Sequence, residues 1–164
     1  MKYFKSWFLL SIFLFIFWLL LAGTDLQELI VGIAVSILIS SILVKNISVF
    51  DDIKISLKAF ICTIVYICIF MVELIKSNFD VAFRVLHPKL PINPGIVKVR
   101  TELKSKLGRI ILANSITLTP GTLTVEIQED YYYIHWIDVT AEDIDRSTEL
   151  IVKKFEKYLE VIFG

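Results

Sequence analysis

Three long apolar runs dominate the first half of the chain. They cover residues 7–22, 29–44 and 59–75. Each approaches the roughly 20 residues that an α-helix needs to cross the hydrocarbon core of a bilayer. The hydrophobic pattern therefore predicts three transmembrane helices.

The second run carries small residues at helical spacing. Gly32, Ser36 and Ser40 lie four residues apart, and small residues let helices approach closely in lipid. A short turn, Gly23-Thr24-Asp25, joins this run to the first and predicts a tight helical hairpin. We expect the three small residues to pack against another helix, in this chain or in a neighbouring one.

A polar connection, residues 45–58, precedes the third run, and a helical pattern continues beyond that run to Leu86. This continuation is amphipathic rather than apolar all round. Three prolines and a glycine within residues 88–95 then stop the helix, because proline excludes helix and favours an extended linker. The expected organisation is transmembrane helices with an amphipathic extension over residues 1–87, a Pro-rich linker over 88–95 and a domain over 96–164.

The tail alternates between strand and helix patterns. Residues 96–100, 122–128 and 131–138 are predicted strands, by their alternation and β-rich composition. Helical spacing begins at Leu103 and ends before Thr119, and a second helix covers residues 141–162. The predicted fold is an α+β membrane protein, with three N-terminal transmembrane helices followed by a small β-α-β-β-α cytoplasmic domain.

The basic residues suggest the orientation. Residues 76–109 hold eight Lys or Arg against Asp80 and Glu102 only, and loops rich in Lys and Arg usually face the cytoplasm. With three spans, however, a second group of lysines falls on the opposite side of the membrane: Lys2, Lys5, Lys45, Lys54 and Lys58. We follow the denser block, which predicts a multi-pass protein of the cell membrane with a cytoplasmic C-terminal domain.

The first run also has the form of a signal peptide, since Lys2 and Lys5 precede it. No persuasive small-residue cleavage site follows the run, however. We therefore expect it to remain as a membrane helix.

No catalytic pattern occurs in the sequence. His87 and His135 are the only histidines, Cys62 and Cys68 lie inside an apolar run, and no phosphate-binding or dinucleotide glycine motif is present. Acidic residues surround the aromatic run 131–133, which argues against nucleic acid as a partner. We expect no enzyme activity, no cofactor and no bound metal.

Four residues around the end of the third run are candidates for a subunit interface or an ion path: Glu73, Lys76, Asn78 and Asp80. Ionisable groups at membrane depth often face a partner or a water-filled path. The simpler interpretation is an i,i+3 ion pair between Glu73 and Lys76 that anchors the end of the helix. Asn78 can cap the helix or join it to a neighbour.

A second candidate element is the corner between the first helix of the tail and the strand that follows. Its residues are Asn114, Thr117, Thr119, Pro120 and Gly121. Pro120 fixes one backbone angle and Gly121 can take a positive φ, while threonine hydroxyls can satisfy carbonyls at the helix end. Because the corner holds no nucleophile, base or metal ligand, we expect it to serve in docking or folding.

The segment 112–125, LANSITLTPGTLTV, is similar to the signature of the E-type subunit of the multisubunit Mrp (Mnh) Na⁺/H⁺ antiporter family. Further matches occur in the same order at residues 17–20, 73–78, 81–82 and 135–138. The resemblance implies a small subunit with membrane helices and a cytoplasmic α/β domain, associated with proton-translocating subunits. The same subunit type occurs in archaeal membrane-bound hydrogenase and sulfur-reducing complexes, and the sequence does not choose between these assemblies.

The expected function is therefore that of a non-catalytic assembly subunit in a cation/proton antiporter module. Its partners are then other membrane subunits and the lipid bilayer. An alternative is a membrane-anchored regulatory or ligand-binding domain that acts alone. A pocket lined by convergent polar groups in the tail would favour that alternative.

Overall fold

The computed structural model describes residues 2–45 and 52–164. The chain divides into two compact units, residues 1–53 and 54–164, and each is described by itself. The polar connection predicted at residues 45–58 lies partly outside the described residues.

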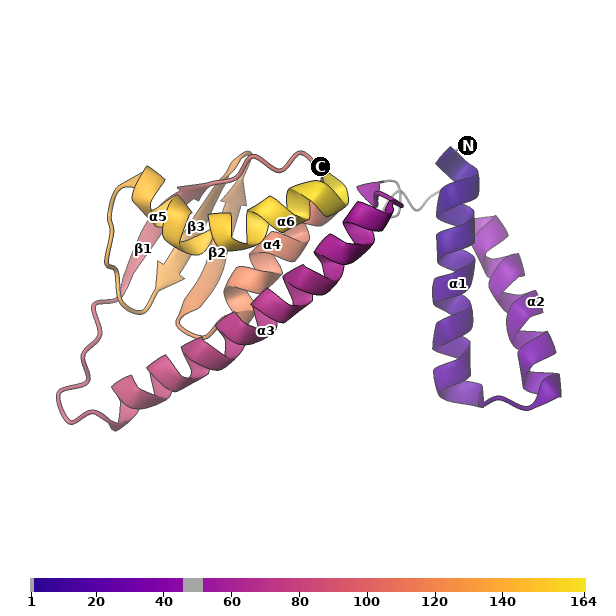
Figure 1. The fold of residues 1–164 in the computed structure, drawn as a ribbon, viewed down its shortest axis with the longest axis horizontal. Coiled ribbons are helices and arrows are strands. Elements are labelled where there is room, and N and C mark those ends of the chain that lie inside the picture. The colour runs from indigo at the N-terminus through magenta and orange to yellow at the C-terminus, as the bar shows by residue number, and fades with distance from the viewer. Residues whose placement is uncertain (1, 46–51) are drawn as a thin grey trace. The chain divides into compact units, whose positions relative to one another are not determined.

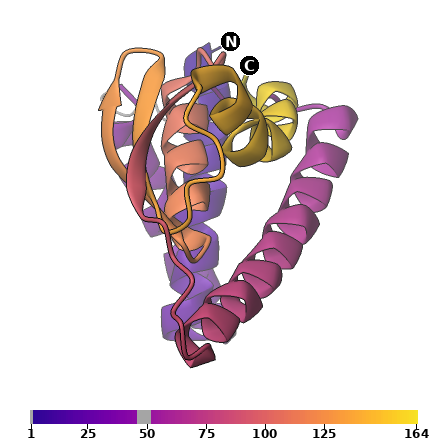
Figure 2. The ribbon, with the colours of Figure 1, turned by 90° about the vertical axis from the view of Figure 1, so that its left-hand side faces the viewer.

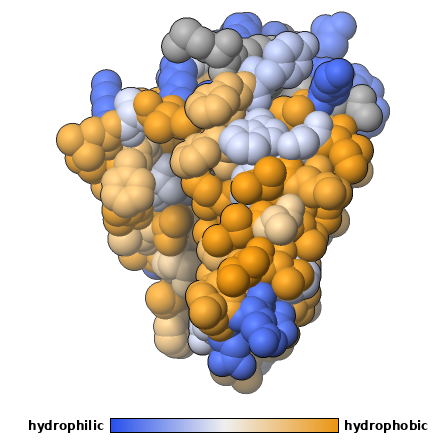
Figure 3. All heavy atoms as spheres, turned by 90° about the vertical axis from the view of Figure 1, so that its right-hand side faces the viewer, coloured by the Kyte–Doolittle hydropathy of each residue, from blue (hydrophilic) through white to orange (hydrophobic). Residues whose placement is uncertain are grey.

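The first unit is a helical hairpin (Figure 1) of α1, Lys2–Ala22, and α2, Leu26–Leu43. Gly23 makes the turn with φ of 99°, in the left-handed region where only glycine is free of strain. Apolar residues cover most of the face shown in Figure 3, and hydrophilic residues gather at its ends. Both helices are long and apolar enough to cross a membrane.

Small residues form the contact between α1 and α2. Gly32, Ser36 and Ser40 are the buried residues of α2, and the Ser40 hydroxyl lies 2.6 Å from that of Ser11 on α1. A Cβ added to Gly32 would lie only 2.5 Å from Cδ1 of Trp18. The predicted close packing of these small residues is thus confirmed, and the partner is a helix of the same chain.

The second unit begins with α3, Leu57–Leu86, a single helix of 30 residues. Ser56 caps its start by accepting a hydrogen bond from the Ala59 N–H, and Pro88 follows its end. The helix joins the third apolar run to its amphipathic extension. By length and composition α3 is the third helix suited to cross a membrane.

A three-stranded antiparallel sheet forms the centre of the tail, in the order β1-β3-β2. The strands are β1, Gly95–Arg100; β2, Thr122–Gln128; and β3, Tyr131–Trp136. β2 contains a register irregularity between Thr124 and Glu126. Alternate residues of β1 and β3 point into the core, as the predicted pattern requires.

Helices α4, Lys106–Leu118, α5, Ile144–Ile151, and α6, Lys153–Phe163, lie between the sheet and α3 (Figures 1 and 2). The core contains fully buried side chains from β3, α4, α6 and the segments beside these helices: Leu103, Leu112, Ile116, Tyr132, Ile134, Val152, Phe155 and Leu159. The helix predicted at residues 141–162 is split at Val152, so the sheet is followed by two helices. The predicted fold class is otherwise confirmed: three long apolar helices precede a small α/β domain.

The third apolar helix packs against this domain. Cys62, Tyr66 and Phe70 of α3 contact the core, and the rings of Tyr66 and Phe70 both lie 6.3 Å from that of Phe155. In space, α3 therefore belongs to the same compact unit as the sheet. In the sequence, the Pro-rich segment 88–95 separates the two. The division into parts 1–87 and 96–164 remains a prediction.

Candidate functional site

The corner after α4 is built from threonine hydroxyls that bond to helix carbonyls. Thr119 donates to the Ser115 carbonyl at 2.7 Å, and Thr122 donates to the Ile116 carbonyl at 2.6 Å. Carbonyls in the last turn of a helix lack partners within the helix. The two hydroxyls therefore satisfy carbonyls at the end of α4.

Gly121 joins the corner to its neighbours. Its φ is 92°, the positive value expected from the sequence, and its carbonyl accepts a hydrogen bond from the Ile137 N–H at 2.8 Å. A Cβ at this position would meet Cγ2 of Ile137 at 3.0 Å and Cγ2 of Val81, on α3, at 3.6 Å. The Thr117 hydroxyl accepts from the Thr124 N–H at 3.1 Å. The corner is thus hydrogen-bonded to β2 and to Ile137 and lies next to α3.

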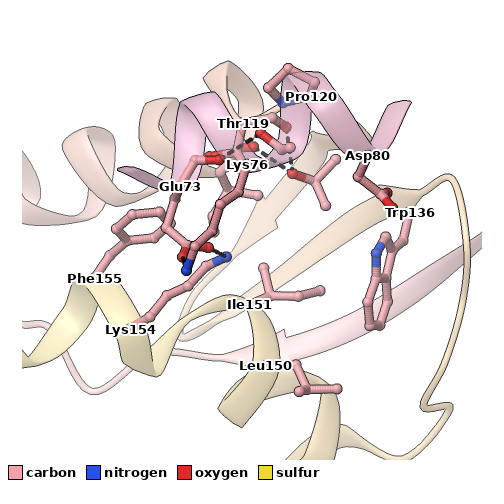
Figure 4. A pocket seen from close by; sticks show the side chains of 13 residues that line it. Glu73, Lys76, Asp80, Thr119, Pro120, Trp136, Leu150, Ile151, Lys154 and Phe155 are labelled. Carbon is pink, nitrogen blue, oxygen red and sulfur yellow. Dashed lines mark hydrogen bonds and ion pairs between the residues drawn. The ribbon is translucent and has the colours of Figure 1, made fainter. Parts of the chain in front are cut away.

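A cavity of about 240 Å³ lies next to this corner, between α3 and the domain (Figure 4). Its lining comes from α3, α4, the corner, β3, α5 and α6. The structure therefore brings together two groups that the sequence suggested separately. Of the first group Glu73, Lys76 and Asp80 line the cavity, and of the second Thr119 and Pro120 do so.

Glu73 is the centre of an ion cluster at the cavity. Its carboxylate oxygens lie 2.7 Å from Nζ of Lys154, on α6, and 3.5 Å from Nζ of Lys76. Figure 4 shows Glu73 and Lys154 pointing toward one another. The expected pair with Lys76 is present, but the shorter contact joins α3 to α6 across 81 residues of sequence.

Asp80 belongs to a second ion cluster, centred on Arg84. The Arg84 guanidinium lies 2.7 Å from the Asp80 carboxylate and 2.8 Å from that of Asp138, which follows β3. It also donates to the carbonyl of Pro91 in the linker at 2.8 Å. This cluster holds the end of α3 to the sheet and to the linker.

The two candidate asparagines lie outside the cavity lining. Asn78 donates to the carbonyl of Leu74, on its own helix, at 2.7 Å. Asn114 is exposed on α4. Neither residue belongs to the buried core of the domain.

Glu156 on α6 is a buried carboxylate that the sequence interpretation did not identify. It is 1% exposed and accepts hydrogen bonds from the Thr101 hydroxyl at 2.5 Å and the Glu102 N–H at 2.7 Å. Nζ of Lys153 lies 2.8 Å from its other oxygen. Burial alone would raise the pKa of Glu156, but the bonds to Lys153, Thr101 and Glu102 outweigh it and hold the pKa below the ordinary value.

One sequence signal pointed to Glu156. The residue lies on the apolar stripe of the last helix, four residues after Val152 and three before Leu159. A charged residue at such a position is buried and needs partners. Those partners, Thr101 and Glu102, come from a loop more than 50 residues earlier, which no local pattern reveals.

The chemistry of the site is that of paired charges. Across residues 2–45 and 52–164, no three His, Cys, Asp or Glu side chains gather as a metal site would require. At the cavity, Glu73 and Asp80 each have a basic partner. This arrangement can hold α3 against the domain and can present charge to a neighbouring surface.

Comparisons with known proteins agree with the resemblance seen in the sequence. The family model MNHE, described as Na⁺/H⁺ ion antiporter subunit, matches residues 11–162. The E-type Na⁺/H⁺ antiporter subunit of Alkalihalophilus pseudofirmus is 48% identical over 79 residues, 47% of this chain and 50% of that protein. The E1-type subunit of Staphylococcus aureus is 40% identical over 95 residues, 54% of this chain and 60% of that protein.

A solved structure matches almost the whole chain. It is a chain of the membrane-bound sulfane sulfur reductase, an archaeal respiratory membrane complex, with a TM-score of 0.85 and 44% identity. The match covers 97% of this chain and 99% of that one. The two curated relatives, in contrast, are matched over only 50% and 60% of their own length.

Proposed function

The chain belongs to the MNHE family of Na⁺/H⁺ ion antiporter subunits, and we propose from this that it is a non-catalytic assembly subunit of a multisubunit cation/proton antiporter module. The observation that carries the proposal is the match to a respiratory-complex chain over 97% of the sequence. That match includes both the membrane helices and the small domain.

The site supports a role in assembly. Its charged residues pair with one another and its threonines bond to backbone carbonyls, so the side chains maintain the positions of α3, the corner and α6. Two members of the ion clusters are exposed to solvent: the side chain of Lys76 is 69% exposed and that of Asp80 is 57% exposed. We propose that Glu73, Lys76 and Asp80 contribute to contact with a neighbouring subunit and that the domain is cytoplasmic.

A second candidate function is the same role within a redox-coupled complex. The sulfane sulfur reductase chain is 44% identical over nearly its full length, whereas the curated antiporter subunits match about half of this chain. The likeness over nearly the full length of both chains supports this candidate beside the antiporter. The proposed work of the subunit is the same in both assemblies.

Purification under gentle conditions tests the proposal. The full chain, tagged at its C-terminus, is solubilised in a mild detergent, captured, and its companions identified by mass spectrometry. Large multispan subunits should co-purify, and redox subunits among them would identify the respiratory version. A stable monomer without companions would contradict the proposal and favour a domain that acts alone.

Activity is the second measurement. In membrane vesicles from cells lacking this chain, Na⁺-dependent dissipation of a pH gradient should fall together with the amount of assembled complex. If the complex remains fully assembled while exchange is lost, the non-catalytic assignment is wrong.

A further inference from the structure

The domain packs along the entire apolar part of α3. Ala59 is buried at the first turn, Cys62, Tyr66 and Phe70 contact the core over the next turns, and Glu73 pairs with Lys154 beyond them. The Tyr66 hydroxyl also hydrogen-bonds to the hydroxyl of Ser115 on α4. These contacts occur at successive helical turns, so one face of α3 is covered throughout residues 59–75.

The covering elements are unsuited to a bilayer interior. α6 carries exposed Lys153, Lys157 and Glu160, and charged side chains are rare and costly within the hydrocarbon core. Behind α6 lies a three-stranded sheet that is not closed into a barrel, with β1 and β2 as its outer strands. Open sheet edges do not occur in the hydrocarbon region of a membrane. If α3 crossed the bilayer, this domain would have to lie beside it inside the membrane.

The opposite face of α3 is a continuous apolar stripe. Its residues recur every three or four positions and are between 44% and 73% exposed: Phe60, Ile64, Ile67, Met71, Ile75, Phe79 and Phe83. No charged residue occurs between Lys58 and Glu73. The other face of α3 is covered by the domain, whose α6 exposes Lys153, Lys157 and Glu160. The helix and domain together therefore have one apolar and one polar side, as segments that lie in the plane of a membrane interface do.

We propose that α3 lies along the membrane surface, with this stripe immersed in the boundary between headgroups and acyl chains. The domain then sits on the aqueous side of the helix. α1 and α2 are the spans in this arrangement. The length and apolarity of α3, which suit a span, serve instead to anchor the domain to the lipid.

The distribution of charge supports this arrangement independently. With two spans, all 17 Lys and Arg residues of the chain lie on one side of the membrane, because none occurs between Lys5 and Lys45. The turn at residues 23–25, on the other side, carries Asp25 and no basic residue. Loops on the cytoplasmic side are enriched in Lys and Arg. Two spans satisfy this rule, whereas three spans place two groups of basic residues on opposite sides of the membrane.

Labelling of single cysteines tests the topology. In a background with Cys62 and Cys68 replaced by alanine, cysteines are placed at exposed positions on either end of α3, Lys58→Cys and Lys89→Cys. A membrane-impermeant maleimide is applied to intact cells and to inverted vesicles. Both positions should react from the same side, and the control Thr24→Cys, in the α1–α2 turn, from the other. Reaction of Lys58→Cys and Lys89→Cys from opposite sides would show that α3 spans the bilayer.

Spin labelling tests the lipid contact. A label at Met71→Cys in the complete assembly, reconstituted in liposomes, should collide readily with oxygen and poorly with a water-soluble nickel chelate. Its depth should be about 5–10 Å below the headgroups. A label at Lys157→Cys, on the aqueous face of α6, provides the control with high nickel accessibility.

Two outcomes at Met71→Cys would overturn the proposal. Low collision rates with both oxygen and nickel would mean that another subunit covers the stripe, and a depth at the bilayer centre would mean that α3 crosses. These results do not depend on which complex contains the chain. The proposed position of α3 can therefore be wrong while the proposed assembly function is right, and the assembly function can be wrong while the position of α3 is right.

Discussion

Replacing Gly121 with alanine isolates the backbone requirement of the corner. The residue has φ of 92°, a conformation that costs a residue with a side chain about 1–3 kcal/mol. The new Cβ would also lie 3.0 Å from Cγ2 of Ile137. For a domain of about this size, the strain alone corresponds to a decrease in melting temperature on the order of 5–20 °C.

The chain offers a matched control for the steric part. A Cβ at Gly95 would also lie 3.0 Å from a Cγ2 atom, that of Val139, but Gly95 does not have a positive φ. Gly95→Ala should therefore report the cost of crowding alone. The difference between the two variants measures the strain at Gly121.

Thermal unfolding of the purified protein in detergent, followed by near-UV circular dichroism, gives both values. The double variant Gly121→Ala with Ile137→Ala removes the close contact but keeps the backbone strain, so it should not regain the stability of Ile137→Ala alone. Equal melting temperatures for Gly121→Ala and Gly95→Ala would refute the reasoning, since positive φ would then carry no cost.

Three further substitutions test other parts of the structure. Gly32→Leu places atoms where the Trp18 ring lies, so it should disrupt the α1–α2 contact and reduce the yield of assembled complex, measured by native electrophoresis; normal assembly would contradict the close packing. Glu156→Gln should cost about 1–3 kcal/mol near pH 7. The pKa of Glu156 in the folded protein lies below its ordinary value of 4.5. Its contribution to the free energy of unfolding is therefore complete above pH 4.5 and is lost as the pH falls through the folded-state pKa. The variant should lose less stability than the wild type on acidification, and the same loss of stability in both proteins would refute the assignment. His135→Gln, at an exposed position of β3, should leave the pH dependence of ion exchange unchanged, and loss of activity in a fully assembled complex would contradict this.

Local patterns were sufficient to predict most elements of this fold. Alternation located β1 and β3 because alternate residues of these strands are buried in the core, and β2 was located by its β-rich composition. Long apolar runs located the first three helices because such runs are visible in the local sequence. The split of the last helix at Val152 was not predicted, since the apolar stripe continues through the break. The predicted helical spacing began at Leu103, whereas α4 begins after Ser105. The Ser105 side chain caps the helix there by accepting a hydrogen bond from the Gly108 N–H.

The candidate site could be predicted only in part. Glu73 and Thr119 were each identified from their own segments, but their meeting in one cavity depends on how α3 docks. That docking relies on pairs distant in sequence, such as Glu73 with Lys154 and Tyr66 with Phe155. An apolar run of this length suggests a membrane span when read alone, because nothing in it reveals that a charged domain will cover one side.

The register irregularity in β2 bears on whether copies of this chain can aggregate through that strand. β2 is an outer strand with exposed Leu123, Val125 and Ile127, and an apolar edge with unpaired backbone groups invites another chain to add a strand. A bulge bends and twists such an edge, and here it places the exposed carboxylate of Glu126 opposite Tyr133. We therefore expect the edge of β2 to pair poorly with another copy of the chain, which would disfavour cross-β aggregation.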